Sequence, residues 1–357
     1  MLHKLWGVGL VVVLGLVWFA LGETAGNANG PDAGLPLKVQ QAPPGPRDPA
    51  PTGPPDVQPL AAPDRDPDVQ DSLLPAGRQA EENPLVRKAQ QARASGDEAG
   101  AQALLRRAIQ EATTVEQAAR AGLFLAPSVQ DSAERRVYLS AALEAGVVHG
   151  AEYDAVGAQL RELNRKPSES LHALLDLETY TVGSGDSLWK LCNRTFAERF
   201  GARVEVGLVR LVNGLSRDTL SVGQKLLVPR LPLTIHVDAD GHGLVAWIGG
   251  VAVAAYQVGL GKDGRTPRRT FTVQVKQEEP AWFYGGRTIP YGDPQNILGT
   301  RWMGFDNQPE ASGFGIHGTS LPESIGRDES MGCVRMRNPE VEELFDLAPK
   351  GTTVTVR

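Results

Sequence analysis

The residues best suited to nucleophilic chemistry lie in one segment, GIHGTSLPESIGRDESMGCVRMRN, at residues 315 to 338. Cys333 is one of only two cysteines in 357 residues, and His317 precedes it by 16 positions. A catalytic cysteine needs a base that takes its proton, a positive environment and backbone N–H groups for the oxyanion. A loop and a returning strand can close this separation, so His317 is the candidate base. Spacing alone leaves open that both are ordinary loop residues.

Two residues beside Cys333 fit a nucleophilic role. Gly332 lets the backbone approach a substrate closely and leaves N–H groups near the thiol available. Arg335 places a fixed positive charge on the same side of the chain as Cys333 if the segment is extended. If His317 serves Cys333, the pKa of this thiol should lie below its usual value of about 8.5.

The other histidines lack such a setting, and no metal site is expected. Only His317 stands in a Gly-rich loop that leads to a cysteine; the remaining histidines are His3, His149, His172, His236 and His242. The sequence has no C-x-x-C or H-x-x-x-H pair that could complete a four-ligand zinc site. We therefore expect chemistry without a metal.

A mainly β domain over residues 232 to 357 must position these side chains. The short segments LTIHVD, GLVAWIGG, VAVAAYQVG, RTFTVQVKQ and TTVTVR are rich in β-branched and aromatic residues and are separated by Gly, Asp and Pro turns. This pattern predicts strands. Two long loops interrupt the strands, and one of them carries His317 and Cys333. Functional residues concentrate on loops held by a rigid scaffold.

The same segment resembles the L,D-transpeptidase catalytic domain, also called the YkuD domain, over essentially all of residues 232 to 357. The family pattern is His-Gly-Thr followed by Ser-x-Gly-Cys-aliphatic-Arg. It is matched here by His317, Gly318, Thr319, Ser330, Gly332, Cys333, Val334 and Arg335. The segments GKDGRTPRRTF, PAW, NILGTRW and NPEVEELFDLAPKGTTVTV also match in order.

The resemblance implies a role for each residue of the site. Cys333 would be the nucleophile, His317 the general base and later the acid, and the carbonyl of Gly318 would orient the imidazole. The N–H groups of Met331, Gly332 and Cys333 would stabilise the oxyanion. The implied substrate-binding residues are Ser330, Met331, Arg335 and Thr319.

The implied reaction is acyl transfer on peptidoglycan stem peptides without an organic cofactor. The thiolate attacks the carbonyl of the third residue of a tetrapeptide stem, D-alanine leaves, and an amine of a second stem resolves the thioester. Two alternatives remain open. Water could replace the amine, which would make the protein an L,D-carboxypeptidase, or the domain could be a degenerate binder without chemistry.

Two positions depart from the family pattern. Met331 stands where the family often has a second histidine, so a hydrogen bond from that ring to substrate would be missing. Arg269 stands where the family's TPxG pattern usually has glycine. If that position requires a positive φ, arginine costs about 1 kcal/mol relative to glycine.

Residues 178 to 230 predict a compact β-α-α-β module. YTVGSGDSLWKLCNRTF contains a strand at residues 180–182 and a helix start capped by Asp186 or Ser187. A second helix ends at Asn213-Gly214, and QKLLVP closes the module as a strand. We expect core packing for Trp189 and Leu191 and a buried thiol for Cys192. A disulfide between Cys192 and Cys333 would join separate domains and stays an open alternative.

These residues resemble a LysM domain over positions 180 to 229. The resemblance implies binding to glycans that contain N-acetylglucosamine, such as peptidoglycan, in a shallow groove beside two loops. The loop residues implied as ligands are Gly183, Gly185, Asp186, Asn213 and Gly214.

Residues 84 to 175 predict a small α-helical region. They are rich in Ala, Leu, Arg, Gln and Glu, with apolar residues at three- and four-residue spacing. One helix hairpin is faintly similar to a tetratricopeptide-type repeat, without a demonstrable period. Nothing in this region suggests catalysis, and we interpret it as a helical spacer.

The N-terminus predicts export. Residues 5 to 22 carry no charge and follow Lys4, which indicates a membrane anchor over residues 1–22 with the rest of the chain outside. A cleaved signal peptide is the alternative. Residues 23–83 are rich in Pro, Gly and Ala and should form a disordered tether. We expect a location in the cell envelope: inner-membrane anchored with periplasmic or extracytoplasmic domains, or secreted to the cell wall after cleavage.

Charge gives no reason to expect a nucleic-acid partner, because the formal net charge is −6 and no long basic run occurs. The expected chain is a multidomain α+β protein. It comprises a membrane helix, a Pro-rich tether, a helical region, a LysM module and a mainly β catalytic domain. Its expected partners are peptidoglycan stem peptides, glycan strands and, through the N-terminal segment, a membrane.

Overall fold

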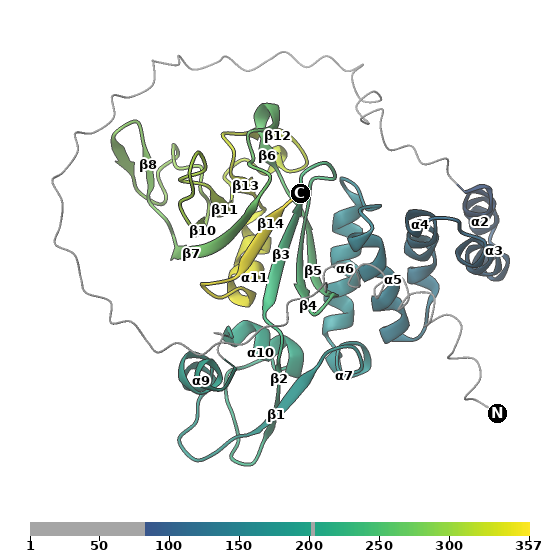
Figure 1. Cartoon of the computed structure of the whole chain (residues 1–357), viewed down its shortest axis with the longest axis horizontal. Helices are drawn as coiled ribbons and strands as arrows, with labels where there is room; N and C mark the ends of the chain where they lie inside the picture. Colours follow the sequence, from purple (N-terminus) through teal and green to yellow (C-terminus); the bar gives the residue numbers. More distant parts are fainter. Residues whose placement is uncertain (1–82, 201–203) are drawn as a thin grey trace, which may run out of the picture.

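The computed structural model describes residues 83–200 and 204–357 (Figure 1). The expected anchor at residues 1–22 and the tether at 23–83 lie outside the described residues, apart from Asn83. Within the described ranges, no helix is long and apolar enough to cross a membrane. These ranges comprise a helical region, a small two-stranded module and a mainly β C-terminal domain.

An eight-stranded sheet forms the centre of the C-terminal domain, in the order β13-β11-β10-β7-β14-β3-β4-β5. Its strands are β3 (Leu233–Asp238), β4 (Gly243–Ile248), β5 (Val251–Gln257), β7 (Thr270–Glu278), β10 (Arg301–Phe305), β11 (Gly315–His317), β13 (Val334–Arg335) and β14 (Thr353–Val356). The pairs β11–β13 and β14–β3 are parallel, and the other neighbours are antiparallel. The expectation of a mainly β domain is confirmed.

Both faces of the sheet are covered, which explains why β4 is buried along its whole length. Successive side chains of a strand point to opposite faces. Leu244, Ala246 and Ile248 enter a core that includes residues of α11 (Asn338–Leu347). Val245 and Trp247 enter a second core shared with the helical region. One strand thus joins two hydrophobic layers.

Two short strand pairs flank the sheet. β6 (Leu260–Gly261) pairs in parallel with β12 (Asp328–Ser330), and β8 (Trp282–Tyr284) forms an antiparallel pair with β9 (Arg287–Ile289). Short 3-10 turns interrupt the loops at η4 (Lys262–Gly264) and η5 (Pro322–Ser324). Because β12 ends three residues before Cys333, the β6–β12 pair holds one flank of the candidate nucleophile.

The helical region consists of α2 (Pro84–Ala94), α3 (Glu98–Gln110), α4 (Val115–Leu125), η2 (Ala126–Ser128), α5 (Ser132–Glu144), α6 (Glu152–Asn164) and α7 (Pro167–Ser170). Side chains that accept backbone N–H groups cap the first four α-helices: Asn83, Asp97, Thr114 and Asp131. Such caps satisfy N–H groups that have no partner inside the helix, and they explain where these helices begin.

The helical region packs against the eight-stranded sheet instead of standing apart as a spacer (Figure 1). The buried Arg136 of α5 donates to the carbonyl of Ala252 at 2.8 Å, and Asn164 of α6 donates to that of Val253 at 2.9 Å. Both acceptors belong to β5, the edge strand of the sheet. At Gly157 of α6, an added Cβ would lie 2.2 Å from a β5 carbonyl, so this helix approaches the strand closely. The helices therefore cover an otherwise unpaired sheet edge.

The small module has the expected β-α-α-β order. β1 (Leu177–Thr181) pairs antiparallel with β2 (Lys225–Pro229). Between them lie α8 (Leu188–Lys190), a π-helical turn η3 (Leu191–Thr195), α9 (Phe196–Phe200) and α10 (Val206–Asn213). Gly214 follows α10 in the left-handed conformation, with φ of 62°, which explains why this helix ends at the Asn-Gly pair.

The module's first helix corrects one expectation and decides two others. Ser187 is the cap, because its hydroxyl accepts the Lys190 N–H at 3.3 Å. Leu191 is fully buried as expected, but Trp189 is 70% exposed, so the expected core packing of Trp189 is wrong. Trp189 follows the helix cap by two positions and points away from the small core. Cys192 is buried and free, and Cys333 is also free, so this structure contains no disulfide between them.

The module also contacts the C-terminal domain. At Gly207 of α10, an added Cβ would lie 2.3 Å from the Asp346 carbonyl of α11, so the two helices touch. Lys276 of β7 donates to Glu205 at 2.6 Å and to the carbonyl of Phe345 at 2.7 Å. The ammonium group of Lys276 also lies 4.3 Å from the centre of the Phe345 ring. These contacts fix the module beside α11.

Candidate active site

The parallel strands β11 and β13 bring the candidate catalytic residues to one face of the sheet. In their register, Ile316 lies opposite Val334 and His317 lies opposite Arg335. Ile316 and Val334 are fully buried in the core. Because side chains alternate along a strand, His317 and Arg335 belong to the opposite face, and Cys333 lies in the bend directly before β13, two positions before Arg335. The sequence-predicted cluster is thus brought together by strand pairing.

The imidazole of His317 is buried and held in one orientation. Its Nδ1 lies 2.5 Å from the carbonyl oxygen of Gly318. A carbonyl only accepts, so Nδ1 carries the proton, and in the neutral ring Nε2 carries the lone pair. The Trp302 ring from the neighbouring β10 lies 5.8 Å from the imidazole, centre to centre. Burial lowers the pKa of His317 to about 4, against the opposing effect of the Gly318 carbonyl. The ring is therefore neutral at pH 7.

The thiol of Cys333 is protonated in the free protein, which corrects the expectation of a depressed pKa. Cys333 is only partly exposed, and burial raises the pKa of its thiol to about 11. A hydrogen bond with the Gly315 backbone and the charge of Arg335 act in the opposite direction, but they are weaker than burial. The thiol also lies 3.9 Å from the carbonyl of Gly313. The thiol of Cys333 and the imidazole of His317 are therefore both neutral at pH 7.

Ser330 organises the turn that presents Cys333. Its buried hydroxyl donates to the carbonyl of Cys333 at 2.7 Å and accepts the N–H of Gly332 at 3.0 Å. The Gly332 N–H is thus occupied, which corrects its expected role as an oxyanion donor. Gly332 itself is required by space, since its φ is 132° and an added Cβ would lie 2.3 Å from the ring of Phe314. Met331 and Cys333 remain as candidate donors.

Arg335 is a buried cation beside the nucleophile. Its backbone forms two hydrogen bonds with Gly259, with N–H to carbonyl distances of 2.8 and 2.9 Å. Only 7% of the residue is exposed, and burial lowers the pKa of its guanidinium. Among the described residues, its buried Nε finds no acceptor. An unpaired buried donor costs free energy, so an anionic ligand at this place would be stabilised.

Asn338, at the start of α11, is a positioning residue that the sequence interpretation missed. Its Oδ1 accepts the N–H of Thr319 at 3.1 Å and that of Thr300 at 3.3 Å. An added Cβ at Gly318 or at Gly299 would lie 2.2 Å from this same oxygen. Asn338 therefore ties together the two loops around His317. The signal available in the sequence was the Asn-Pro pair, which is typical of a helix start.

The remaining substrate-site candidates occupy different environments. Thr319 is buried, and its hydroxyl accepts the N–H of Leu321 at 3.0 Å, so it shapes the loop after His317. Met331 is 51% exposed beside Cys333. Arg269 does not have a positive φ, so arginine at this position carries no backbone cost relative to glycine. Its guanidinium donates to the Pro309 carbonyl at 3.0 Å.

The implied glycan-binding residues lie in two loops of the LysM-like module. Asp186 accepts the Gly183 N–H at 2.8 Å and the hydroxyl of Tyr180 at 2.9 Å, and the Gly183 bond is the main cause of its lowered pKa. Gly185 has a φ of 79°, as tight turns require. Asn213 uses its amide to bind the Leu227 backbone twice, at 2.7 and 2.8 Å, so its side chain supports the fold, and Gly214 ends the helix.

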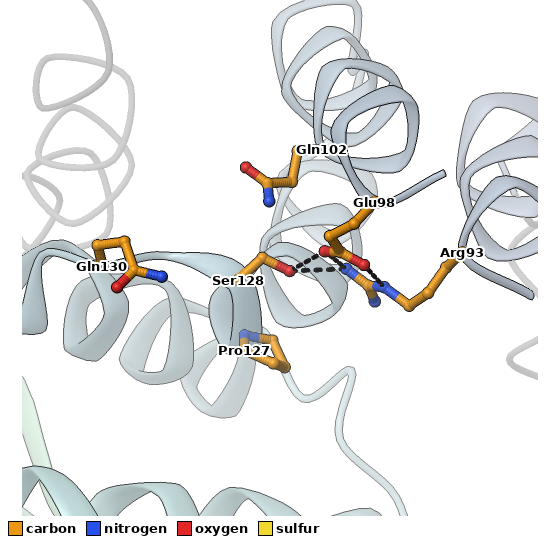
Figure 2. A pocket seen from close by; sticks show the side chains of 6 residues that line it. All are labelled: Arg93, Glu98, Gln102, Pro127, Ser128 and Gln130. Carbon is orange, nitrogen blue, oxygen red and sulfur yellow. Dashed lines mark hydrogen bonds and ion pairs between the residues drawn. The ribbon is translucent and has the colours of Figure 1, made fainter. Parts of the chain in front are cut away.

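One open hollow lies on the helical region, outside the catalytic domain (Figure 2). It is lined by Arg93, Glu98, Gln102, Pro127, Ser128 and Gln130. Figure 2 shows Arg93, Glu98 and Ser128 bonded to one another, and the bond from Arg93 lowers the pKa of Glu98 to about 2. None of these residues belongs to a strand of the candidate site. Within residues 83–200 and 204–357, no group of three or more His, Cys, Asp or Glu side chains could hold a metal ion.

Residues 232–356 match the L,D-transpeptidase catalytic domain, and residues 180–229 match the LysM domain, so both resemblances are confirmed. YqjB of Bacillus subtilis, named as an L,D-transpeptidase, is 46% identical over 103 residues, 28% of this chain and 57% of that protein. The chain thus spans little more than half of YqjB. YkuD of Bacillus subtilis, likewise named, is 30% identical over 50% of this chain and 98% of that protein. The solved L,D-transpeptidase of Mycobacterium smegmatis has 21% identity and a TM-score of 0.30, over 38% of this chain and 64% of that one.

Proposed function

Since the chain belongs to the L,D-transpeptidase family, we propose that Cys333 forms a thioester with the third residue of a peptidoglycan tetrapeptide stem. The observation that supports this most directly is the pairing of β11 with β13, which sets His317 opposite Arg335, two positions after Cys333, with the imidazole oriented by Gly318. An amine of a second stem then receives the acyl group. The family and the LysM match support the proposed peptidoglycan specificity.

The proposed reaction begins from a neutral pair. As the sulfur of Cys333 attacks the peptide carbonyl, Nε2 of His317 takes the thiol proton, so base catalysis and attack coincide. The N–H groups of Met331 and Cys333 would stabilise the oxyanion. When the C–N bond breaks, the imidazolium gives its proton to the departing D-alanine amine. The acceptor amine repeats these steps in reverse, and the thiol is regenerated.

Arg335 is proposed to bind a carboxylate of the substrate. Its guanidinium is buried beside the nucleophile, and its Nε lacks an acceptor among the described residues. A tetrapeptide stem carries a terminal carboxylate on the D-alanine that leaves. Guanidinium and carboxylate form strong paired hydrogen bonds, so this contact would hold the leaving residue in place.

Purified disaccharide-tetrapeptide tests the proposal by product mass. A cross-linked dimer with release of D-alanine is the expected product. A tripeptide would instead identify an L,D-carboxypeptidase that uses water, and no product would favour a peptidoglycan binder without chemistry. Cys333→Ala should abolish the product, and Cys192→Ala, which changes the cysteine of the LysM-like core, is the matched control.

A carbapenem offers a second test, because its strained ring carbonyl is an acyl donor for a reactive thiol. Mass spectrometry of the intact protein should show one adduct on Cys333. His317→Ala should slow this acylation by about 10² to 10⁴, the usual range for a positioned base. An adduct on Cys192 at the same rate would contradict a special role of Cys333.

The accessory parts are proposed to bring the enzyme to its substrate. The LysM-like module has its own core of buried residues, so residues 178–230 should pellet alone with purified peptidoglycan. An unrelated acidic domain of the same size should stay in the supernatant. A location in the cell envelope is proposed from residues 1–22, and removal of this segment should shift the protein from the membrane fraction to the cytosol. A mature N-terminus just after residue 22 would indicate a cleaved signal peptide.

A further inference from the structure

Two ion pairs join α6 of the helical region to α11 of the catalytic domain. Asp154 pairs with Arg337 through two contacts of 2.8 and 3.0 Å, and Arg161 pairs with Glu343 at 3.5 Å. Asp154 and Arg161 are seven positions apart, which places them on the same side of α6, about two turns from each other. The two pairs therefore lie along one interface, at different heights on α11.

The Asp154 pair meets the end of α11 that borders the active site. Arg337 follows Cys333 by four positions and immediately precedes α11. Its guanidinium forms parallel bonds with both oxygens of Asp154, a geometry that restricts direction as well as distance. It also donates to Glu340 at 3.1 Å and to the side chain of Gln257 at 3.2 Å. Arg337 is thus fixed from three sides.

The contact with Gln257 extends to the other flank of the nucleophile. An added Cβ at Gly326 would lie 2.5 Å from the Gln257 amide nitrogen, so the two residues touch. Gly326 leads into β12, whose last residue is Ser330, the residue that bonds the Cys333 turn. Arg337 therefore borders, through Gln257, the segment that carries Ser330.

The residue after Arg337 acts on the other side of the site. Asn338 holds the N–H groups of Thr300 and Thr319 and contacts Gly318, whose carbonyl fixes the His317 ring. A shift of Arg337 would move Asn338 with it, because the two are adjacent in the chain. The orientation of His317 would then change although no group of the site is removed.

We propose that Asp154, supplied by the helical region, is a positioning residue of the active site. It holds Arg337, and through Arg337 it holds Asn338 and the Gly318 carbonyl that orients His317. By this inference, the helical region helps to hold the active-site residues in place. The inference rests on the proposed function in one respect, the role of His317 as the base.

The test compares two variants of the full-length chain. Asp154→Asn removes the pair next to the site, and Arg161→Gln removes the second pair of the same interface. Asp154→Asn should lower kcat in the tetrapeptide assay about 10-fold or more with little change in KM, because misplacing a catalytic group mainly costs rate. Arg161→Gln should keep kcat within about twofold. Its melting temperature should nevertheless fall by about as much as that of Asp154→Asn. Asp154→Glu, which preserves the carboxylate, should recover most of the lost rate.

Hydrogen exchange in the absence of substrate provides a readout that does not need activity. The amides of Thr300 and Thr319 should exchange at least about 10-fold faster in Asp154→Asn than in the wild type, since their acceptor Asn338 is loosened. Arg161→Gln should leave both amides unchanged. A wild type that is never acylated would reject the proposed function, and the amide exchange would still decide the role of Asp154.

Two outcomes would overturn the inference. One is an equal loss of kcat in Asp154→Asn and Arg161→Gln, which would show that the interface contributes only general stability. The other is unchanged exchange of the Thr300 and Thr319 amides in Asp154→Asn.

Discussion

At the residue scale, burial sets the resting state of the site. It raises the pKa of Cys333 to about 11 and lowers that of His317 to about 4, so neither group is charged at neutral pH. The nearby charge of Arg335 favours a thiolate but does not outweigh the loss of solvent. The reactivity of the Cys333 thiol should therefore depend on proton transfer to His317 during the attack on the substrate.

Alkylation of the free protein by iodoacetamide checks this resting state. The rate at Cys333 should rise steadily with pH from 7 towards the pKa of about 11, because only the thiolate reacts. His317→Ala should change this rate little. Cys192, whose pKa burial raises to about 12, is the internal control and should react more slowly throughout. A rate that is already constant near pH 7 would instead mean a preformed thiolate–imidazolium pair.

The buried His317 should also make stability depend on pH. Its ordinary pKa is about 6.5, and the folded protein lowers this to about 4, so the unfolded chain binds a proton that the folded protein excludes. Stability should therefore fall as the pH drops from about 6.5 to about 4, by roughly 3 kcal/mol in total from this group. Urea unfolding at several pH values should show this slope in the wild type and a smaller one in His317→Gln. Parallel curves for the two proteins would contradict the assignment.

At the element scale, side chains of the helices bind the backbone of β5, the edge strand of the sheet. β5 exposes backbone groups on its outer side, and side chains of α5 and α6 bind them: the hydroxyl of Ser140 accepts the Ala252 N–H at 3.0 Å, and Arg136 donates to the Ala252 carbonyl. Buried backbone groups need partners, and these side chains supply them. Local helix propensity explains α5 and α6, but their place on the sheet depends on these long-range bonds.

Arg136→Met tests how much this edge depends on one side chain. The substitution leaves the Ala252 carbonyl, the Asn164 side chain and the Ser170 hydroxyl without their donor. We expect a loss of about 3 kcal/mol in urea unfolding, since unpaired buried acceptors are costly. Arg135→Met is the control, because Arg135 is the neighbour of Arg136 in the chain but pairs with the exposed Glu162. This substitution should lower the free energy of unfolding by less than about 1 kcal/mol. Similar losses in both variants would argue against a special role of the buried guanidinium.

At the scale of the whole molecule, the catalytic sheet serves as the base for both accessory parts. The LysM-like module touches α11 at Gly207, and the helical region touches α11 through Asp154 and Arg161. A glycan held by the module would therefore have a restricted position relative to the active site. Such an arrangement raises the effective concentration of nearby stem peptides without any new contact at Cys333.

Removal of the helical region should damage the catalytic domain itself. A chain of residues 176–357 would expose the apolar face formed by Val245, Trp247, Ala252 and Ala255. We expect it to melt at least about 10 °C below a chain of residues 83–357 and to aggregate more readily. Differential scanning calorimetry and light scattering provide the measurement. Equal melting temperatures would restore the interpretation of a separate spacer.

The sequence by itself determined the local elements and indicated the candidate site residues. Alternating segments predicted β3, β4, β5, β7 and β14, and the Gly-Asp-Ser start and Asn-Gly end predicted the helices of the LysM-like module. These features depend on nearest neighbours along the chain, which explains why they could be predicted. The His-Gly-Thr and Ser-x-Gly-Cys-aliphatic-Arg motifs around His317 and Cys333 carried the resemblance to the family, whereas the spacing of the two residues alone left their chemistry open.

Only the tertiary structure decided the environment of those residues. The raised pKa of Cys333, the occupied N–H of Gly332 and the exposed Trp189 depend on which other segments lie nearby. The contact between Asp154 and Arg337 joins residues 183 positions apart. No local pattern encodes such a pair, because burial and electrostatics are set by the folded arrangement of distant elements.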